Sequence, residues 1–279
     1  MKMLILKELF KNKRHFLIGR KLKIFLGIGI GILYLPFIFS GNLYASEMTS
    51  IQEVICEETE YQTNVYYFSA EDEGPTVMIL SGVHGNELAG IEASRIFMEN
   101  FHPDKGTVIF IPEANKRACE KRVRSLSPEE DLNRLFPGDL SSDGIQKLAG
   151  EIFRVMTENK VTFLLDLHES VNYYHEDPNR YGQTIILDDN AYSLLQEIGN
   201  YLIHRLNSNI SDQNKSFEVI IKPIHGSSTY EALKLHDIPS ITFETCMKME
   251  LSERVDLHYQ CIESLLKYYK IISSSLIAK

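Results

Sequence analysis

Cysteine is scarce in this sequence, and its spacing argues against two kinds of site. The 279 residues include four cysteines, and no two of them form a Cys-x-x-Cys pair. Neither a zinc knuckle nor a redox dithiol is therefore indicated. The spacing assigns no disulfide pairing among Cys56, Cys119, Cys246 and Cys261.

Linkers and repeats are missing as well. No stretch rich in Pro, Gly and Ser divides residues 46–279, and they contain no internal repeat or low-complexity tract. A chain of this length is typical of one α/β domain. We therefore predict a single domain over residues 46–279.

Positive charge is in short supply outside the N-terminal segment. The whole chain has 29 Lys and Arg against 38 Asp and Glu, a formal charge of −9. Residues 1–45 hold eight of the basic residues and one acidic residue, so the remainder carries about −16. A chain this acidic is poorly suited to nucleic acid, and we predict no nucleic-acid partner.

The first 45 residues have the plan of an export signal. Residues 1–23 are basic, residues 24–40 are uncharged and apolar, and Leu43-Tyr44-Ala45-Ser46 offers a cleavage site after Ala45. The apolar run is also close to the roughly 18 residues that a membrane span needs. An uncleaved membrane anchor with its basic end in the cytoplasm is therefore the alternative. Both interpretations place residues 46–279 outside the cytoplasm, either secreted or membrane-anchored.

Strand-like and helical patterns alternate after this segment. The strand-like runs are residues 61–69, 76–81, 107–112, 161–167, 183–187, 217–221 and 240–243. Helical periodicity appears over residues 87–101, 145–156, 194–203 and 252–276. The alternation predicts an α/β fold with a mixed, largely parallel sheet and helices on both faces.

One turn carries the strongest chemical signal. The stretch Ser81-Gly82-Val83-His84-Gly85-Asn86-Glu87 follows an apolar run and predicts a strand end, a tight turn and a helix start. The step from His84 to Glu87 can bring an imidazole and a carboxylate to one point. A catalytic zinc site needs three such protein ligands and an open position for water. His168 is the candidate third ligand because it ends another strand, and open α/β sheets build sites at strand ends.

Three further segments accompany these residues. They are Asp131-Leu132-Asn133-Arg134-Leu135-Phe136-Pro137-Gly138, Asp166-Leu167-His168-Glu169 and Ile241-Thr242-Phe243-Glu244-Thr245. In this order and spacing, residues 75–246 resemble the zinc carboxypeptidase superfamily, most closely its succinylglutamate desuccinylase and aspartoacylase branch. The resemblance implies a zinc carboxypeptidase-like fold and one zinc ion per chain, held by His84, Glu87 and His168.

The resemblance also implies the catalytic groups. Glu244 matches the general base and acid, which takes a proton from the attacking water and passes it to the leaving amine. A carboxylate at the end of an apolar strand is in any case costly unless something uses it. Arg124 matches the arginine that polarises the scissile carbonyl and stabilises the oxyanion, with Arg122 as the nearby alternative. Glu231, a second acid in a helical pattern, is interpreted as a surface residue.

Substrate binding is implied at Asn133 and Arg134, which match the family pair that holds the substrate carboxylate. An arginine fork suits this role because it can bind a carboxylate through two hydrogen bonds. Asp131 matches the carboxylate that orients the first histidine ligand, here His84. Asp166 is interpreted as a structural residue outside the site.

Two features depart from the family pattern. The turn Gly226-Ser227 lacks the preceding tyrosine that carboxypeptidases of this superfamily usually offer, which leaves Tyr230 or His225 to replace it. Aspartoacylase-type enzymes also carry a C-terminal β domain over the site, whereas this chain ends at Lys279. We expect an open site that accepts a peptide terminus or a cell-wall peptide.

The sequence therefore predicts a zinc-dependent hydrolase that cleaves an amide bond, in a peptide or an N-acyl group, next to a free carboxylate. The alternatives are an N-acyl-amino-acid deacylase of the desuccinylase and aspartoacylase type, a catalytically inactive zinc- or ligand-binding module, and a two-histidine, one-carboxylate iron oxygenase. The presence of both Glu244 and Arg124 argues against the binding module. The step from His84 to Glu87 is longer than the usual first step of an oxygenase triad.

Overall fold

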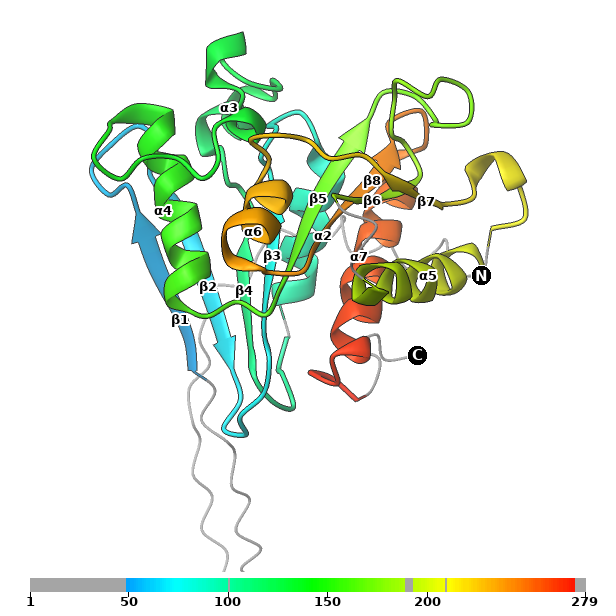
Figure 1. The fold of residues 1–279 in the computed structure, drawn as a ribbon, viewed down its shortest axis with the longest axis horizontal. Helices are drawn as coiled ribbons and strands as arrows, with labels where there is room; N and C mark the ends of the chain where they lie inside the picture. Colours follow the sequence, from blue (N-terminus) through cyan, green and yellow to red (C-terminus); the bar gives the residue numbers. More distant parts are fainter. Residues whose placement is uncertain (1–48, 100, 189–192, 209, 274–279) are drawn as a thin grey trace, which may run out of the picture. The chain divides into compact units, whose positions relative to one another are not determined.

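The computed structural model describes residues 49–273, except residues 100, 189–192 and 209 (Figure 1). The predicted export segment, residues 1–45, lies outside this range. Within the described range, none of the helices combines the length and apolar character that crossing a membrane requires. Export therefore stays a prediction from the sequence.

Eight strands form a mixed sheet in the order β1-β2-β4-β3-β5-β8-β6-β7. The strands are β1 Thr49–Ile55, β2 Thr63–Ser69, β3 Thr76–Ser81, β4 Thr107–Ile111, β5 Phe163–Ser170, β6 Thr184–Leu187, β7 Glu218–Ile221 and β8 Ser240–Cys246. The central strands β4, β3, β5 and β8 run parallel, as do β6 and β7. The pairs β1–β2, β2–β4 and β6–β8 are antiparallel. The predicted mixed sheet is confirmed.

Helices cover both faces of the sheet because successive strand residues point to opposite sides. On β3, Val77 and Ile79 join one apolar core, and Met78 and Leu80 join the other. Helices α2, α5 and α7 pack in the first core, whereas α4 packs in the second, next to α6. The helices are α2 Leu88–Met98, α3 Lys116–Lys121, α4 Gly144–Glu158, α5 Ser193–Asn207, α6 Ser228–His236 and α7 Leu251–Tyr268, with short 3-10 turns η2 Pro128–Glu130, η3 Leu132–Arg134 and η4 Gln213–Lys215.

The last helix is shorter than the sequence predicted. Helix α7 ends at Tyr268, before the predicted end at residue 276. Lys270 takes a left-handed φ of 56°, and the Ile271 N–H donates to the Leu266 carbonyl at 2.9 Å. These are the features of a Schellman-type helix end, and they turn Ile271 into the first core.

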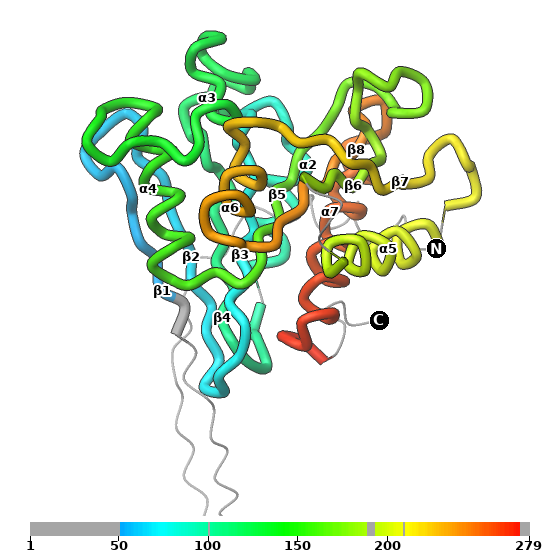
Figure 2. The backbone as a smooth tube through the Cα atoms, in the orientation of Figure 1, coloured from blue at the N-terminus to red at the C-terminus, as the bar shows by residue number. Residues whose placement is uncertain are grey.

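The central parallel strands set the position of the site. Strands β3, β5 and β8 are neighbours, and their register places Ser81 beside Leu167 and His168 beside Glu244. The segments after these strands therefore leave the sheet at one edge, where open α/β sheets bind ligands. Figure 2 shows the β5–β6 connection looping beyond the end of β8 at this edge.

Candidate metal centre and active site

Two glycines fix the turn after β3. Gly82 has a φ of 67°, and a Cβ there would lie 2.9 Å from the Cα of Glu113. A Cβ on Gly85 would lie 1.9 Å from the carbonyl carbon of Ala118 in α3. Neither position accepts a larger residue without a backbone shift. The tight turn predicted from the sequence is present, and it carries His84 into the interior.

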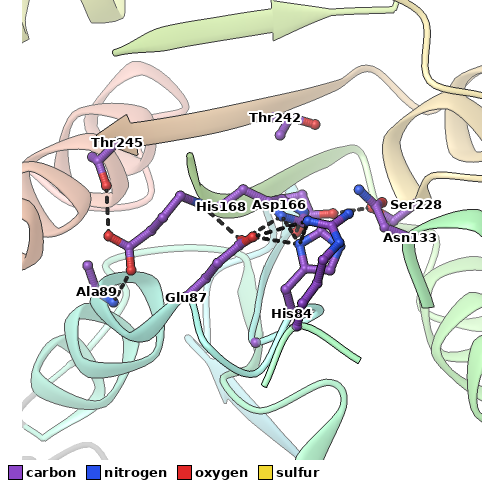
Figure 3. A network of polar contacts seen from close by, with 12 residues as sticks. His84, Glu87, Ala89, Asn133, Asp166, His168, Ser228, Thr242 and Thr245 are labelled. Atoms are coloured by element: carbon purple, nitrogen blue, oxygen red, sulfur yellow. Dashed lines mark hydrogen bonds and ion pairs between the residues drawn. The ribbon is translucent and has the colours of Figure 1, made fainter. Parts of the chain in front are cut away.

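The three predicted ligands converge at the ends of β3 and β5 (Figure 3). The His84 Nδ1 lies 2.7 Å from the Glu87 Oε1, and the His168 Nδ1 lies 2.9 Å from the Glu87 Oε2. The two Nδ1 atoms face each other at 3.1 Å. All three side chains are buried, and their ligand atoms lie within 4.8 Å of one another. The described part of the chain holds no second cluster of this kind.

The chemistry of this donor set fits zinc, since two imidazoles and a carboxylate form many catalytic zinc sites. The outer nitrogen of each ring also faces a carboxylate. His84 Nε2 lies 3.2 Å from Asp131 Oδ1, and His168 Nε2 lies 3.2 Å from Asp166 Oδ1. Asp131 is placed to accept the Nε2–H of His84, which leaves the lone pair of the His84 Nδ1 toward the centre. The contact between Asp166 and His168 is an ion-pair contact without hydrogen-bond geometry.

The position of Asp166 corrects the sequence interpretation, which left it outside the site. Its Oδ1 faces His168, and the Ser228 hydroxyl donates to its Oδ2. Alternate residues of a strand point to the same face, so the two-residue step from Asp166 to His168 was the signal for this contact. Asp131 lies where the resemblance placed it, against His84.

The charges of the triad depend on one another. Burial would raise the pKa of Glu87, but the imidazoles of His84 and His168 hold it well below its usual range. Burial would lower the pKa of His168, but the carboxylates of Asp166 and Glu87 raise it well above its ordinary value. A divalent cation competes with these protons, because metal ligands bind in their deprotonated forms.

Glu244 stands beside the triad because the β5–β8 register sets it opposite His168. Its side chain is buried, and its Oε2 has no hydrogen-bond partner among the described residues. Burial raises the pKa of Glu244 to about 8, against the lowering effects of His168 and Arg124. A dication in the triad would lower it again. The competing acid Glu231 instead accepts the Gly226 N–H at 3.1 Å.

A cavity of about 400 Å³ opens over the triad. Its lining includes six of the eight predicted site residues, and Asp131 and His168 do not line it. The six are His84, Glu87, Arg124, Asn133, Arg134 and Glu244.

Arg124 reaches the triad from the segment after α3. Its Nη1 lies 3.7 Å from Glu87 Oε1, and its Nη2 lies 3.0 Å from Asp131 Oδ2. The Arg124 carbonyl accepts the Gly85 N–H at 3.3 Å, which ties this segment to the ligand turn. The side chain is 49% exposed, so it faces both the triad and the cavity. Arg122, the alternative, caps α3 in a left-handed conformation and does not line the cavity.

Arg134 offers its guanidinium to the same cavity. Its Nη1 donates to the Asn133 carbonyl at 2.6 Å, and none of the described carboxylates forms an ion pair with it. Asn133 is buried with an unpartnered Oδ1. A Cβ on Gly226 would lie 2.5 Å from the Arg134 carbonyl oxygen, so this glycine turn supports the backbone of Arg134.

The β5–β6 connection adds residues that the sequence analysis missed. Arg180 and Tyr181 line the cavity, and the Tyr181 N–H donates to Ser170 Oγ at 3.0 Å. Tyr230 and His225, the expected replacements for the missing tyrosine, contact each other with ring centroids 4.4 Å apart and do not line the cavity. The signal for Tyr181 was its place in a connection between two strands of the site edge.

Comparison with known proteins identifies a matching family. Residues 73–177 match the family described as Succinylglutamate desuccinylase/Aspartoacylase catalytic domain. The predicted resemblance to this branch is confirmed.

Curated relatives match over part of their length. The N-alpha-acetyl-L-2,4-diaminobutyric acid deacetylase of Halomonas elongata is 36% identical over 100 residues, which cover 34% of this chain and 29% of the relative. The aspartoacylase of Danio rerio is 30% identical over 136 residues, which cover 47% of this chain and 42% of the relative. The matched stretch is thus less than half of either relative.

Solved structures share the fold. The tripeptide-bound Cell Shape Determinant Csd4 protein from Helicobacter pylori has a TM-score of 0.67 at 21% identity, over 81% of this chain and 56% of that one. The succinylglutamate desuccinylase/aspartoacylase from Rhodobacter sphaeroides has a TM-score of 0.60 at 19% identity, over 77% and 61%. These likenesses confirm the predicted fold class.

Proposed function

We propose that this protein is a zinc-dependent hydrolase that cleaves an amide bond, in a peptide or an N-acyl amino acid, next to a free carboxylate. One observation carries the proposal. The unpartnered carboxyl group of Glu244 stands against a triad of two imidazoles and a carboxylate at the base of an open cavity. A general base beside a metal site is what metal-assisted amide hydrolysis requires.

The residues around the triad position the three candidate ligands for metal binding. Asp131 orients the imidazole of His84 by a hydrogen bond, and Asp166 lies 3.2 Å from the outer nitrogen of His168 as a negative charge, so that the Nδ1 atoms of both rings face Glu87. When bound there, zinc supplies Lewis acidity, which lowers the pKa of water to about 7 and polarises a carbonyl.

Glu244 accepts the proton of the attacking water and returns it to the leaving amine. Its Oε2 has no partner that competes for the proton. Its backbone is held in β8, where the Gln183 N–H donates to the Glu244 carbonyl at 2.9 Å. A base that is fixed within reach of the water loses little freedom on the way to the transition state.

Two arginines have separate roles, one toward the oxyanion and one toward the substrate carboxylate. Arg124, next to Glu87, stabilises the oxyanion that forms on the scissile carbonyl, because a preorganised donor acts where charge develops. Arg134 and Asn133 bind the substrate carboxylate, since the guanidinium has no ion-pair partner among the described residues and the side-chain amide of Asn133, which lines the cavity, offers its Nδ2–H groups as donors. This division supports an enzyme over an inactive binding module, which has no use for Glu244.

Two substrate classes have separate support. The matched relatives are a deacetylase and an aspartoacylase, which favours an N-acyl amino acid. A fold neighbour is described as a D,L-carboxypeptidase, which favours a peptide terminus, including a cell-wall peptide. Arg180 in the cavity wall adds a cation that suits an acidic group on the substrate.

We also propose that the chain works outside the cytoplasm. The support is the basic and apolar pattern of residues 1–45, which has the plan of a signal peptide or a membrane anchor.

The test uses the zinc-loaded full-length chain and a panel of peptides, muropeptides and N-acyl amino acids, with products identified by mass. We expect a product with a free carboxylate from at least one class, and loss of this product after treatment with a chelator. If the protein binds carboxylates but turns over no substrate of the panel, the hypothesis of an inactive binding module replaces that of an enzyme.

A further inference from the structure

Glu169 is a buried acid that the proposed chemistry does not use. It follows His168 in β5, and its side chain is fully buried. Its carboxylate accepts the Ala89 N–H at 2.8 Å and the Thr245 hydroxyl at 3.2 Å, and it forms an ion pair with Arg254. Glu169 does not belong to the cluster of candidate metal ligands.

Glu169 forms two hydrogen bonds to the start of α2, one to Glu87 and one to Ala89. The Glu169 N–H donates to the Glu87 Oε2 at 3.0 Å, the same oxygen that faces His168. The Glu169 carboxylate binds the N–H of Ala89, in the first turn of the helix that Glu87 precedes. One residue thus fixes both the side chain of Glu87 and the backbone next to it.

Helix α2 depends on this arrangement for its N-terminal cap. Glu87 occupies the N-cap position, but its side chain caps no N–H of the helix because it points into the triad. The free N–H groups of a first turn need other partners, and a carboxylate there is favoured by the helix dipole. Glu169 supplies that carboxylate from a different strand, so Glu87 stays available to the triad.

Arg254 of α7 balances the charge of this buried carboxylate by an ion pair. An unpaired buried charge is strongly destabilising. The Arg254 Nε donates to the Met249 carbonyl at 3.0 Å, which aims its Nη1 at Glu169. One helical turn later, His258 Nε2 lies 3.0 Å from Thr245 Oγ1, which itself donates to Glu169. Helix α7 therefore supports Glu169 at two points.

We propose that the Glu169–Arg254 pair is a positioning device that fixes Glu87 in the geometry of a metal ligand. The proposal rests on the proposed zinc site. Neither residue contacts the metal position, so the pair acts through Glu87 and the start of α2. Support for metal ligands of this kind typically changes metal affinity by about 10- to 100-fold.

The experiment measures zinc affinity of the full-length chain by competition with a chromophoric chelator, and thermal unfolding of the zinc-free chain. The variants are Glu169→Gln, Arg254→Gln and the double variant. Each single variant should bind zinc about 10- to 100-fold more weakly and unfold at a lower temperature. The double variant removes both charges, so its stability should recover toward the parent, whereas its zinc affinity should stay low. Recovered stability together with reduced zinc affinity in the double variant distinguishes a positioning role from a general effect on stability.

A matched control is Arg154→Gln. Arg154 also joins several acids, Glu53 on β1 and Glu151 and Glu158 on α4, but does not contact the triad. This variant should lose stability and keep the parental zinc affinity. Parental affinity in Glu169→Gln, Arg254→Gln and the double variant would overturn the positioning role, and so would an equal loss in Arg154→Gln. A parent chain that binds no zinc would refute the metal site itself.

Discussion

A buried histidine makes the stability of this protein depend on pH. His258 is fully buried in α7, with its Nε2 3.0 Å from Thr245 Oγ1 and its ring 5.0 Å from that of Phe243. Its Nδ1 has no partner among the described residues. Burial lowers the pKa of His258 to about 3; the charge of Glu87 opposes this effect, whereas those of His168 and Arg254 act in the same direction as burial.

The sign and size of the effect follow from linkage. An unfolded histidine has a pKa of about 6.5, so the unfolded chain takes up a proton below that pH while the folded chain stays neutral. The contribution of His258 to the free energy of unfolding is therefore fully present above about pH 6.5 and is lost as the pH falls toward 3. Between pH 7.5 and pH 5, the His258 contribution to the free energy of unfolding should fall by about 2 kcal/mol.

The perturbation is His258→Gln, which removes the titration and keeps a side chain that can bond Thr245. The chain has no tryptophan, so urea unfolding of the zinc-free chain is followed by far-UV circular dichroism at pH 7.5, 6 and 5. Every other titratable group is the same in the two proteins, so the contributions of these groups cancel in the comparison. The parent should lose about 2 kcal/mol more than the variant over this range.

The control is His204→Gln, at an exposed position of α5, which should follow the parent at every pH. If His258→Gln and the parent lose the same free energy of unfolding between pH 7.5 and pH 5, the reasoning about this histidine is wrong.

Three further predictions test the site and the export segment. Arg134→Ala should mainly raise KM, because the substrate carboxylate is present both before and during the reaction. Arg124→Ala should instead lower kcat by about 100- to 1,000-fold. Steady-state kinetics that show similar KM effects for the two variants would contradict these roles. Arg180→Met should lower kcat/KM by about tenfold for a substrate whose acyl group ends in a carboxylate, relative to the matching carboxamide, and the exposed Arg205→Met should leave this ratio unchanged. Residues 1–45 fused to a reporter should carry it across the membrane, and a reporter that stays in the cytoplasm would disprove export.

The sequence was most informative where chemistry follows a strand. His84, His168 and Glu244 each stand at the end of an apolar run, and parallel neighbours bring such ends together. Their convergence could therefore be predicted from the sequence alone. The edge strand β1 escaped prediction because its residues pair only with β2, and an edge strand lacks the continuous apolar run that marked the central strands.

Contacts between distant segments were beyond the sequence. The Glu169–Arg254 pair joins β5 to α7, and no periodicity relates the two residues. Tyr181 reaches the cavity through the path of a connection, whose course depends on packing against β8. Asp166 differs, because its two-residue step from His168 did carry the signal and was interpreted only as structural.

The most direct test of the central claim is the Glu244→Gln variant of the full-length chain, measured for zinc content and turnover together. Glu244 is not one of the three candidate ligands, so the variant should keep about one zinc per chain, as three protein ligands predict. Its turnover should fall at least about 100-fold, the usual lower bound for a general base, while substrate binding changes little. Turnover at the parental rate with full zinc content would contradict the proposed mechanism.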